Sequence, residues 1–241
     1  MWLTPIATLR SRITSTARRY GRAPNSVSLI AVSKTRTSSE ILALAAYGQR
    51  LFGENYLQEA LPKMRTLAGQ LLEWHYIGAL QSNKTQEIAH GFTWVHSIDR
   101  AKIAQRLNEH RPAYLPRLNV CIEVNLGAEA TKSGVALREL PALARAVLAC
   151  PRLRLRGLMA LPAPSKHFDE QRANFRALAE GYHALRAEGI DLDTLSMGTS
   201  EDFEAAIAEG ATMIRIGTAL FGPRGEATLK ARRDCDLIRR Y

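Results

Sequence analysis

One segment, Ser28-Leu29-Ile30-Ala31-Val32-Ser33-Lys34, carries four consecutive apolar side chains and ends in a lysine. A short apolar run of this kind predicts a buried β-strand from Ser28 to Ser33. Lys34 then lies at the carboxyl end of the strand, beside a hydrophobic core. Partial desolvation favours the neutral form of an amine, and a neutral amine forms an imine with an aldehyde. The alternative is that Lys34 extends into water.

Seven further strand-like segments follow, separated by stretches of helical periodicity. The strand candidates are Ser28–Ser33, Arg50–Glu54, Trp74–Gly78, Trp94–Ile98, Leu118–Asn125, Leu153–Leu161, Thr194–Gly198 and Met213–Gly217. The helix candidates are Ser39–Tyr47, Gln58–Leu67, Arg100–Glu109, Leu137–Ala149, Phe168–Glu188 and Asp202–Glu209. Eight such units in 241 residues predict an α/β protein with a single (β/α)₈ TIM barrel. A doubly wound open sheet is the alternative, but the chain lacks its leading glycine fingerprint.

Capping residues help to place the helix ends. Ser38 or Ser39, Asp99 and Ser200 are expected N-caps. The expected stops are Gly48, Gly189 and Gly210.

The amino-terminal segment supports two interpretations. Apolar residues at helical spacing predict an amphipathic helix from about Thr4 to Tyr20, so we expect residues 1–25 to form a helix packed on the barrel. The first 39 residues contain no Asp or Glu, a composition that also resembles an organelle transit peptide. We expect one domain over 1–241, with only a short helical tail after Gly217.

Composition excludes several classes of function. No apolar stretch approaches the length of a membrane span. Cys121, Cys150 and Cys235 are far apart, which argues against a disulfide framework or a metal site and fits a reducing, cytoplasmic compartment. The net charge of +10 is spread over the chain without a nucleic-acid motif, so we expect no specific nucleic-acid partner.

Polar and small residues recur where the predicted strands end, the rim at which barrels carry their chemistry. These residues are Lys34, Asn55, Gly78, Ser97, Asn125, Pro162, Gly198-Thr199-Ser200 and Gly217-Thr218. Backbone N–H groups and hydroxyls in the last two loops suit a phosphate dianion. Ordinary helix caps are the alternative for these loops.

Arg215 is expected to point into the barrel. Strand residues alternate between faces, so Ile214 and Ile216 face the helices and Arg215 faces the interior. A buried guanidinium needs partners or a ligand. Glu123 and Arg156 could also point inward, in which case the three would form a structural ion layer.

A reactive lysine, a phosphate site and an inward arginine together suggest pyridoxal 5′-phosphate (PLP) held as an imine. An arginine beside the pyridine nitrogen keeps that nitrogen unprotonated, because protonation would place two positive charges together. The ring is then a poor electron sink, which disfavours carbanion chemistry.

Nine segments of the chain closely resemble the PLP homeostasis protein family, which consists of single-domain, alanine-racemase-like barrels. They are Ala31-Val32-Ser33-Lys34-Thr35, Phe52-Gly53-Glu54-Asn55-Tyr56, His75-Tyr76-Ile77-Gly78, Leu80-Gln81-Ser82-Asn83-Lys84, His96-Ser97-Ile98-Asp99-Arg100, Lys132-Ser133-Gly134, Arg156-Gly157-Leu158-Met159-Ala160, Ser196-Met197-Gly198 and Arg215-Ile216-Gly217-Thr218-Ala219. Thr199 stands where the family usually has methionine, and Ala79 where it usually has proline.

The resemblance implies a set of cofactor-binding residues and no catalytic residue. Lys34 would form the aldimine and Asn55 would lie beside the ring. The other members are Met197, Arg215 as partner of the pyridine nitrogen, and Ser200, Gly217 and Thr218 as phosphate contacts. The implied function is to carry or buffer PLP and support vitamin B6 and amino-acid homeostasis, without established catalysis. The implied partners are PLP and PLP-dependent apo-enzymes, and the implied state is a monomer or weak homodimer.

Two enzyme classes remain as alternatives. A PLP-dependent racemase of low activity would need a second positioned base, which racemases take from a further domain. An imine-forming sugar-phosphate aldolase tends to carry its lysine on a middle strand. His75 and His96 lack ligand spacing and are expected in the core or at the rim. Lys84 and Lys132 attract phosphate or transiently accept the aldehyde in one interpretation, and are solvated in the other.

Overall fold

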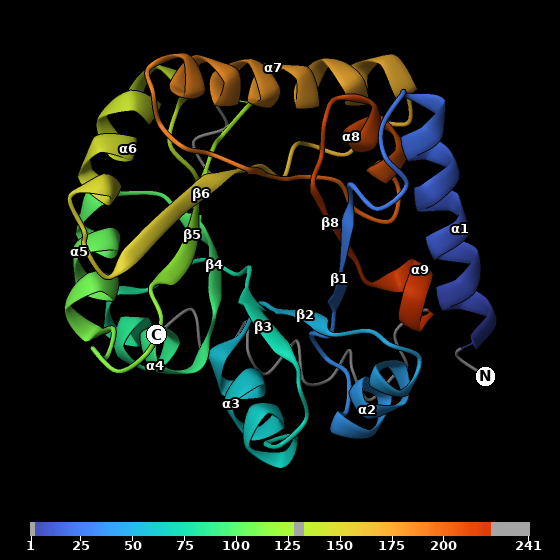
Figure 1. Ribbon diagram of the computed structural model, residues 1–241, viewed down its shortest axis with the longest axis horizontal. Helices are drawn as coiled ribbons and strands as arrows, with labels where there is room; N and C mark the ends of the chain where they lie inside the picture. Colours follow the sequence, from blue (N-terminus) through green and yellow to red (C-terminus); the bar gives the residue numbers. More distant parts are fainter. Residues whose placement is uncertain (1–2, 128–132, 223–241) are drawn as a thin grey trace.

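The eight predicted strands form a closed parallel barrel in which each strand pairs with the next and β8 pairs with β1 (Figure 1). The computed structural model describes residues 3–127 and 133–222. The strands are β1 (Ser28–Val32), β2 (Leu51–Glu54), β3 (Glu73–Tyr76), β4 (Trp94–Ile98), β5 (Leu118–Glu123), β6 (Leu153–Met159), β7 (Thr194–Ser196) and β8 (Met213–Ile216). The barrel prediction is confirmed. The expectation of one domain over 1–241 reaches beyond the described residues and stays a prediction.

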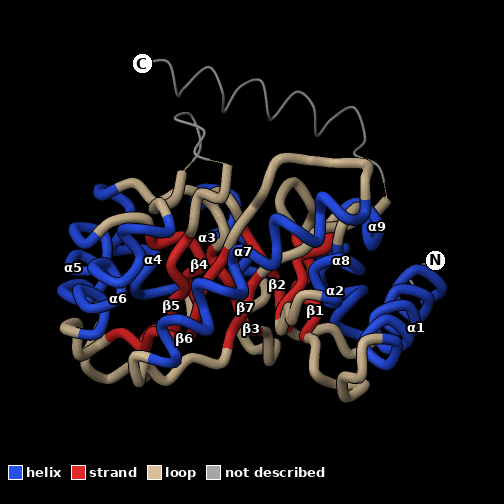
Figure 2. Tube along the Cα trace, turned by 90° about the horizontal axis from the view of Figure 1, so that it is seen from above, coloured by secondary structure: helices blue, strands red, loops and turns tan. Residues whose placement is uncertain are grey.

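Helices surround the strands as an outer layer (Figure 2). They are α1 (Leu3–Arg19), α2 (Ser38–Ala46), α3 (Leu57–Thr66), α4 (Thr85–Gly91), α5 (Ala101–His110), α6 (Leu140–Leu148), α7 (Phe168–Ala187), α8 (Phe203–Ala208) and α9 (Thr218–Phe221). Two 3₁₀ turns, η1 (Ser82–Lys84) and η2 (Leu137–Glu139), precede α4 and α6. The sequence did not predict α4, because its seven residues make only two turns and offer little periodicity to detect.

The expected helix starts were wrong by one or more residues. Thr37, not Ser38 or Ser39, caps α2: its hydroxyl accepts from the Glu40 backbone N–H at 3.3 Å, while the Glu40 carboxylate accepts from the Thr37 N–H at 2.7 Å. Glu40 at the third helical position selects Thr37 because the two complete a capping box.

The other two expected caps were also wrong. The Asp99 carboxylate accepts hydrogen bonds from Arg100, and α5 begins after Arg100. The Ser200 hydroxyl accepts from the Ala219 backbone N–H at 3.3 Å, and α8 begins after Asp202. In contrast, the expected stops are confirmed, since Gly48, Gly189 and Gly210 have φ of 79°, 86° and 96° just beyond helix ends.

Helix α1 lies beside α8 and α9, against the outside of the barrel (Figure 1). Its apolar stripe of Ile6, Leu9 and Ile13 is buried, as the helical spacing predicted. Arg12 adds an ion pair to Glu204 of α8 at 2.7 Å. Helix α1 thus packs beside the two short helices that follow β7 and β8.

Candidate functional site

A cavity of about 240 Å³ opens at the carboxyl ends of the strands. It is lined by Val32, Lys34, Asn55, Ile77, Glu123, Met159, Leu161, Thr199, Ser200, Glu201, Arg215, Gly217 and Thr218. Six of the seven residues predicted from the sequence therefore lie around one cavity, although they come from four separate parts of the chain. The sequence missed the apolar lining, because Val32, Ile77 and Met159 read as ordinary core positions.

Met197 is the predicted site residue that does not line the cavity. Its side chain is fully buried in the hydrophobic core, and its backbone N–H donates to the Met213 carbonyl at 3.0 Å. Its assignment to the cofactor stays a prediction. Lys84 lies in η1 and does not line the cavity either, and Lys132 lies outside the described residues.

Arg215 points into the barrel, as strand alternation predicted, and only 6% of it is exposed. Its guanidinium donates to the Ser196 carbonyl at 2.6 Å, the Ser196 hydroxyl at 2.8 Å and the Ala160 carbonyl at 2.9 Å. Burial lowers the pKa of Arg215, and the charges of Asp202 and Glu123 oppose that shift. Neutral oxygens therefore fix the guanidinium, and its remaining N–H donors are available to a ligand in the cavity.

Arg156 does not join Arg215 in an ion layer. It pairs with Asp193 at 2.6 Å and lies 4.7 Å from the ring centre of Trp94. Within residues 3–127 and 133–222, no carboxylate lies at ion-pair distance from Arg215. A buried cation that lacks a counter-ion among the described residues favours an anionic or electron-rich ligand beside it.

A row of buried polar side chains continues from Arg215 through the barrel. Ser196 Oγ lies 2.8 Å from His96 Nδ1, and His96 Nε2 lies 2.9 Å from His75 Nδ1. His75 Nε2 lies 2.9 Å from the Glu73 carboxylate. Because the arginine only donates, Ser196 Oγ accepts from it, while the tautomers of the two rings set which partner donates in the Ser196–His96 and His96–His75 hydrogen bonds. Both histidines are in the barrel interior, where burial lowers their pKa values and keeps them neutral.

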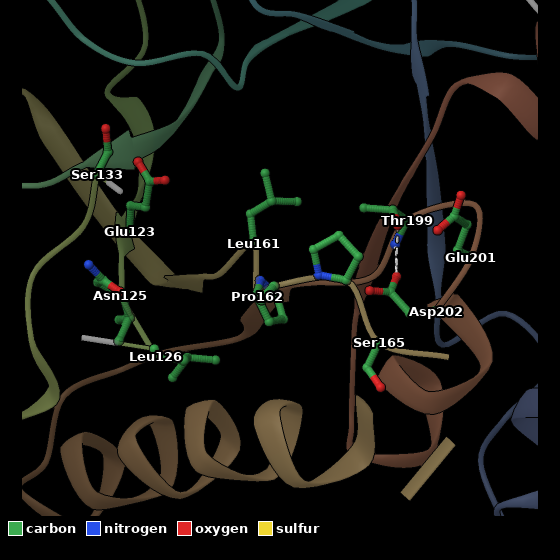
Figure 3. Close-up of a pocket in the computed structure, with 14 residues that line it drawn as sticks. Glu123, Asn125, Leu126, Ser133, Leu161, Pro162, Ser165, Thr199, Glu201 and Asp202 are labelled. Carbon is green, nitrogen blue, oxygen red and sulfur yellow. Dashed lines mark hydrogen bonds between the residues drawn. The ribbon is translucent and has the colours of Figure 1, made fainter. Parts of the chain in front are cut away.

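Glu123 lines the cavity from β5 and also lines a neighbouring cavity of about 410 Å³ (Figure 3). In Figure 3 Glu123 lies with Ser133 and Asn125 on one side of the opening, and Thr199, Glu201 and Asp202 lie on the other side. Burial raises the pKa of Glu123 to about 7, the charge of Asp99 adds to the shift, and Arg215 opposes it. The site therefore contains a carboxyl group that is only partly ionised near neutral pH.

Asn55 is held at the rim by a close approach of two strand ends. A Cβ atom on Gly78 would lie 2.0 Å from the Asn55 carbonyl oxygen, so only glycine fits there. The loop after β3 consequently packs directly on the backbone of Asn55, whose side chain lines the cavity.

The residues present fit PLP. The Lys34 amine can bind an aldehyde, the Arg215 guanidinium can face a ring nitrogen, and the Ser200 and Thr218 hydroxyls can bind a phosphate. The Ser200–Ala219 hydrogen bond joins the two loops that carry these hydroxyls. In the described part of the chain no three His, Cys, Asp or Glu side chains are grouped as metal ligands, and none of its helices is long and apolar enough to cross a membrane.

Comparisons with known proteins agree with this site. Residues 7–225 match the family described as alanine racemase, N-terminal domain. The pyridoxal phosphate homeostasis protein of Pseudomonas aeruginosa is 57% identical over 219 residues, which cover 91% of this chain and 94% of that protein. PipY of Synechococcus elongatus, solved with PLP bound, is 36% identical with a TM-score of 0.77, and the match covers 87% of this chain and 100% of PipY.

Alanine racemase from Corynebacterium glutamicum shares the fold at lower similarity. It is 21% identical with a TM-score of 0.68, and the match covers 90% of this chain and 60% of the racemase. At that identity the likeness concerns the barrel alone.

Proposed function

The chain belongs to the alanine racemase N-terminal domain family and, within it, to the pyridoxal phosphate homeostasis proteins, and on this premise we propose that it carries or buffers PLP at the cavity around Lys34. One observation carries the proposal: Lys34, Arg215 and the hydroxyls of Ser200 and Thr218 line the same cavity of about 240 Å³. These are the three kinds of group that an aldehyde, a pyridine nitrogen and a phosphate require.

In this proposal Lys34 holds the aldehyde carbon covalently, and Ser200, Gly217 and Thr218 hold the phosphate. Arg215 donates to the pyridine nitrogen and keeps it unprotonated, because a second positive charge beside the guanidinium is unfavourable. With Arg215 at that nitrogen, the bound group would supply only weak electron withdrawal, which would not favour proton abstraction from an amino acid. The cavity is accordingly suited to storage and release of PLP rather than to turnover.

We propose that the protein is not an enzyme, and a PLP-dependent racemase of low activity is the second candidate. The fold shared with alanine racemase favours that candidate. Neutral His75 and His96 are separated from the cavity by Ser196 and Arg215, so neither is placed as a second base. Purified protein should therefore interconvert D- and L-alanine at a negligible rate, and brisk interconversion would favour the racemase.

We also propose PLP-dependent apo-enzymes as recipients of the bound PLP, the cytoplasm as the compartment, and a monomer or weak homodimer as the state in solution. The transfer is tested by mixing PLP-loaded protein with an apo-enzyme and an excess of a PLP-trapping scavenger. Activity that appears despite the scavenger supports direct delivery, whereas complete suppression supports release into solution.

The central experiment compares absorption spectra of the wild type and Lys34→Ala after incubation with PLP. The wild type should show the visible band of an imine and the variant should not. Borohydride reduction followed by peptide mapping should place a pyridoxyl group on Lys34. A label on another lysine, or a colourless wild type as expected of a sugar-phosphate aldolase, would contradict the proposal.

A further inference from the structure

The backbone on both sides of Lys34 is tied to charged side chains of the β2–α3 unit. On one side, the Lys63 ammonium donates to the Ser33 carbonyl at 2.9 Å. On the other side, the Thr35 backbone N–H donates to a Glu59 carboxylate oxygen at 2.7 Å. The residues on both sides of Lys34 are therefore held by two side chains, Lys63 and Glu59, that belong to α3 and not to the strand of Lys34.

Lys63 and Glu59 belong to one charge cluster, which also contains Glu54. Lys63, only 9% exposed, pairs with the fully buried carboxylate of Glu54 at 2.8 Å, and its ammonium lies 3.6 Å from Glu59. The Ser33 hydroxyl donates to the same Glu54 oxygen at 2.7 Å. Burial raises the pKa of Glu54, while Lys63 and Ser33 oppose the shift. Buried charges arranged in this way fix geometry more than they add stability.

Thr35 has a backbone conformation that requires such support. Its φ is +65°, in the left-handed region, and it is the one non-glycine residue with positive φ in the described parts of the chain. A β-branched residue is strained there, and strain of this kind persists only where the surrounding structure imposes it. The Arg36 backbone N–H closes a turn onto the Ser33 carbonyl at 3.0 Å, and the hydrogen bond from the Thr35 N–H to Glu59 holds this turn from outside.

The same cluster also reaches the neighbouring strand end at the cavity, because β1 pairs with β2. Glu54 is the last residue of β2 and directly precedes Asn55, which lines the cavity with Lys34. A shift of the cluster would therefore move two cavity residues together. None of its three charged members lines the cavity, so the cluster acts on a ligand only through these neighbours.

We propose that Glu59, supported by Lys63 and Glu54, is a positioning residue that orients Lys34 for covalent capture of an aldehyde. This inference rests on the function proposed above. It concerns the imine bond and not the binding of the ring or phosphate, because Glu59 contacts the loop that carries the lysine and no part of the phosphate-binding loops.

The test uses two substitutions and two ligands. Glu59→Ala removes the acceptor for the Thr35 N–H, and Glu59→Gln restores an acceptor without the charge. Glu59 is suitable because its side chain is 24% exposed, whereas removal of Lys63 would leave two carboxylates without their cation and could prevent folding.

The two ligands separate capture of the aldehyde from binding of the ring and phosphate. PLP forms an imine, and pyridoxine 5′-phosphate, an alcohol of the same shape, cannot. Glu204→Ala, which breaks the surface pair with Arg12, is the control for general destabilisation.

The expected result is a loss that is specific to the aldehyde. Glu59→Ala should weaken PLP binding and reduce borohydride-trapped Lys34 by about tenfold, less than the roughly hundredfold cost of a full 1 Å misplacement of a reacting group. Its affinity for pyridoxine 5′-phosphate should stay within about twofold of the wild type. Glu59→Gln should recover most of the PLP binding, and Glu204→Ala should match the wild type with both ligands.

Two outcomes would overturn the inference while leaving the proposed function intact. One is a Glu59→Ala protein that captures PLP as the wild type does. The other is an equal loss of both ligands in a folded protein, which would indicate a general structural role. Failure of the proposed function is separate, because the wild type itself would then show no pyridoxyl group on Lys34.

Discussion

His75 and His96 share a hydrogen bond of 2.9 Å inside the barrel, and this pair connects Glu73, beneath the cavity, to Ser196 and Arg215. The pair comes from neighbouring strands, β3 and β4, and both rings are inaccessible to solvent. The direct partners of Arg215 are thus neutral oxygens, and the acid of the row, Glu73, lies at its far end. The charge of Arg215 stays directed toward the cavity.

Replacing His96 by leucine should both destabilise the fold and weaken PLP binding. The substitution removes the hydrogen bonds of His96 with Ser196 Oγ and with His75 Nδ1, both buried, at a cost of about 1–3 kcal/mol. It also releases one constraint on the Arg215 guanidinium. Urea unfolding of the apo-protein and PLP titration measure the two effects. His96→Gln, which keeps polar atoms at this position, should recover part of each. Unchanged stability in His96→Leu would show that the row of hydrogen bonds is not formed.

The two histidines should also make stability depend on pH in the acidic range. Burial lowers the pKa of each below the usual 6.5, so the unfolded chain binds more protons than the folded one once the pH falls below that value. Stability is therefore retained above about pH 6.5 and declines as the pH is lowered through the folded pKa values. The decline should be shallower in His96→Leu than in the wild type, when unfolding free energies are compared between pH 7 and pH 5. Equal slopes would contradict the assignment.

Glu123 should have the opposite dependence. Its pKa is raised from 4.5 to about 7, so the folded state binds more protons than the unfolded chain between these values, and its contribution to stability is lost as the pH rises through that window. The full difference corresponds to at most about 3 kcal/mol above pH 7. Glu123→Gln should accordingly be more stable than the wild type at pH 8, by about 1–3 kcal/mol, and show little gain at pH 5. Glu87→Gln, at an exposed site on α4, is the control and should change neither value.

Gly78→Ala should disrupt the rim next to Asn55. The added Cβ would lie 2.0 Å from the Asn55 carbonyl oxygen, so the backbone of one loop has to move. We expect a loss of about 2–3 kcal/mol in unfolding free energy, comparable with overpacking of a core, together with weaker PLP binding. Gly91→Ala is the matched control, because the nearest atom there is the flexible end of Met64 at 3.2 Å. Two variants of equal stability would show that the rim can shift freely.

Sequence periodicity was sufficient to predict the barrel and the inward direction of Arg215. The barrel follows from the repetition of β-then-α units, and the direction of Arg215 follows from the two-residue repeat of a strand. The cavity residues could be predicted for the related reason that parallel strands end at the same rim. The helix caps were harder to predict from the sequence. Thr37 and Ser38 are both acceptable caps, and the choice between them depends on the position of Glu40 in the helix.

Contacts between strands and helices could not be predicted in the same way. The pairing of His75 with His96 depends on the register of β3 against β4, which aligns His75 with Trp94. The Glu54–Lys63 pair depends on how α3 packs over β2, and the sequence contains no sign of it beyond a glutamate at a strand end. These contacts determine how the predicted residues are oriented, and only the three-dimensional packing provides them.

The pairing of β8 with β1 places Ile30 beside Arg215, so the first and last strands complete the cavity together. A growing chain on the ribosome that has released Lys34 but not Thr218 possesses the amine without the anion-binding loops. PLP can therefore bind at this cavity only after nearly the entire barrel has been synthesised and has left the ribosome.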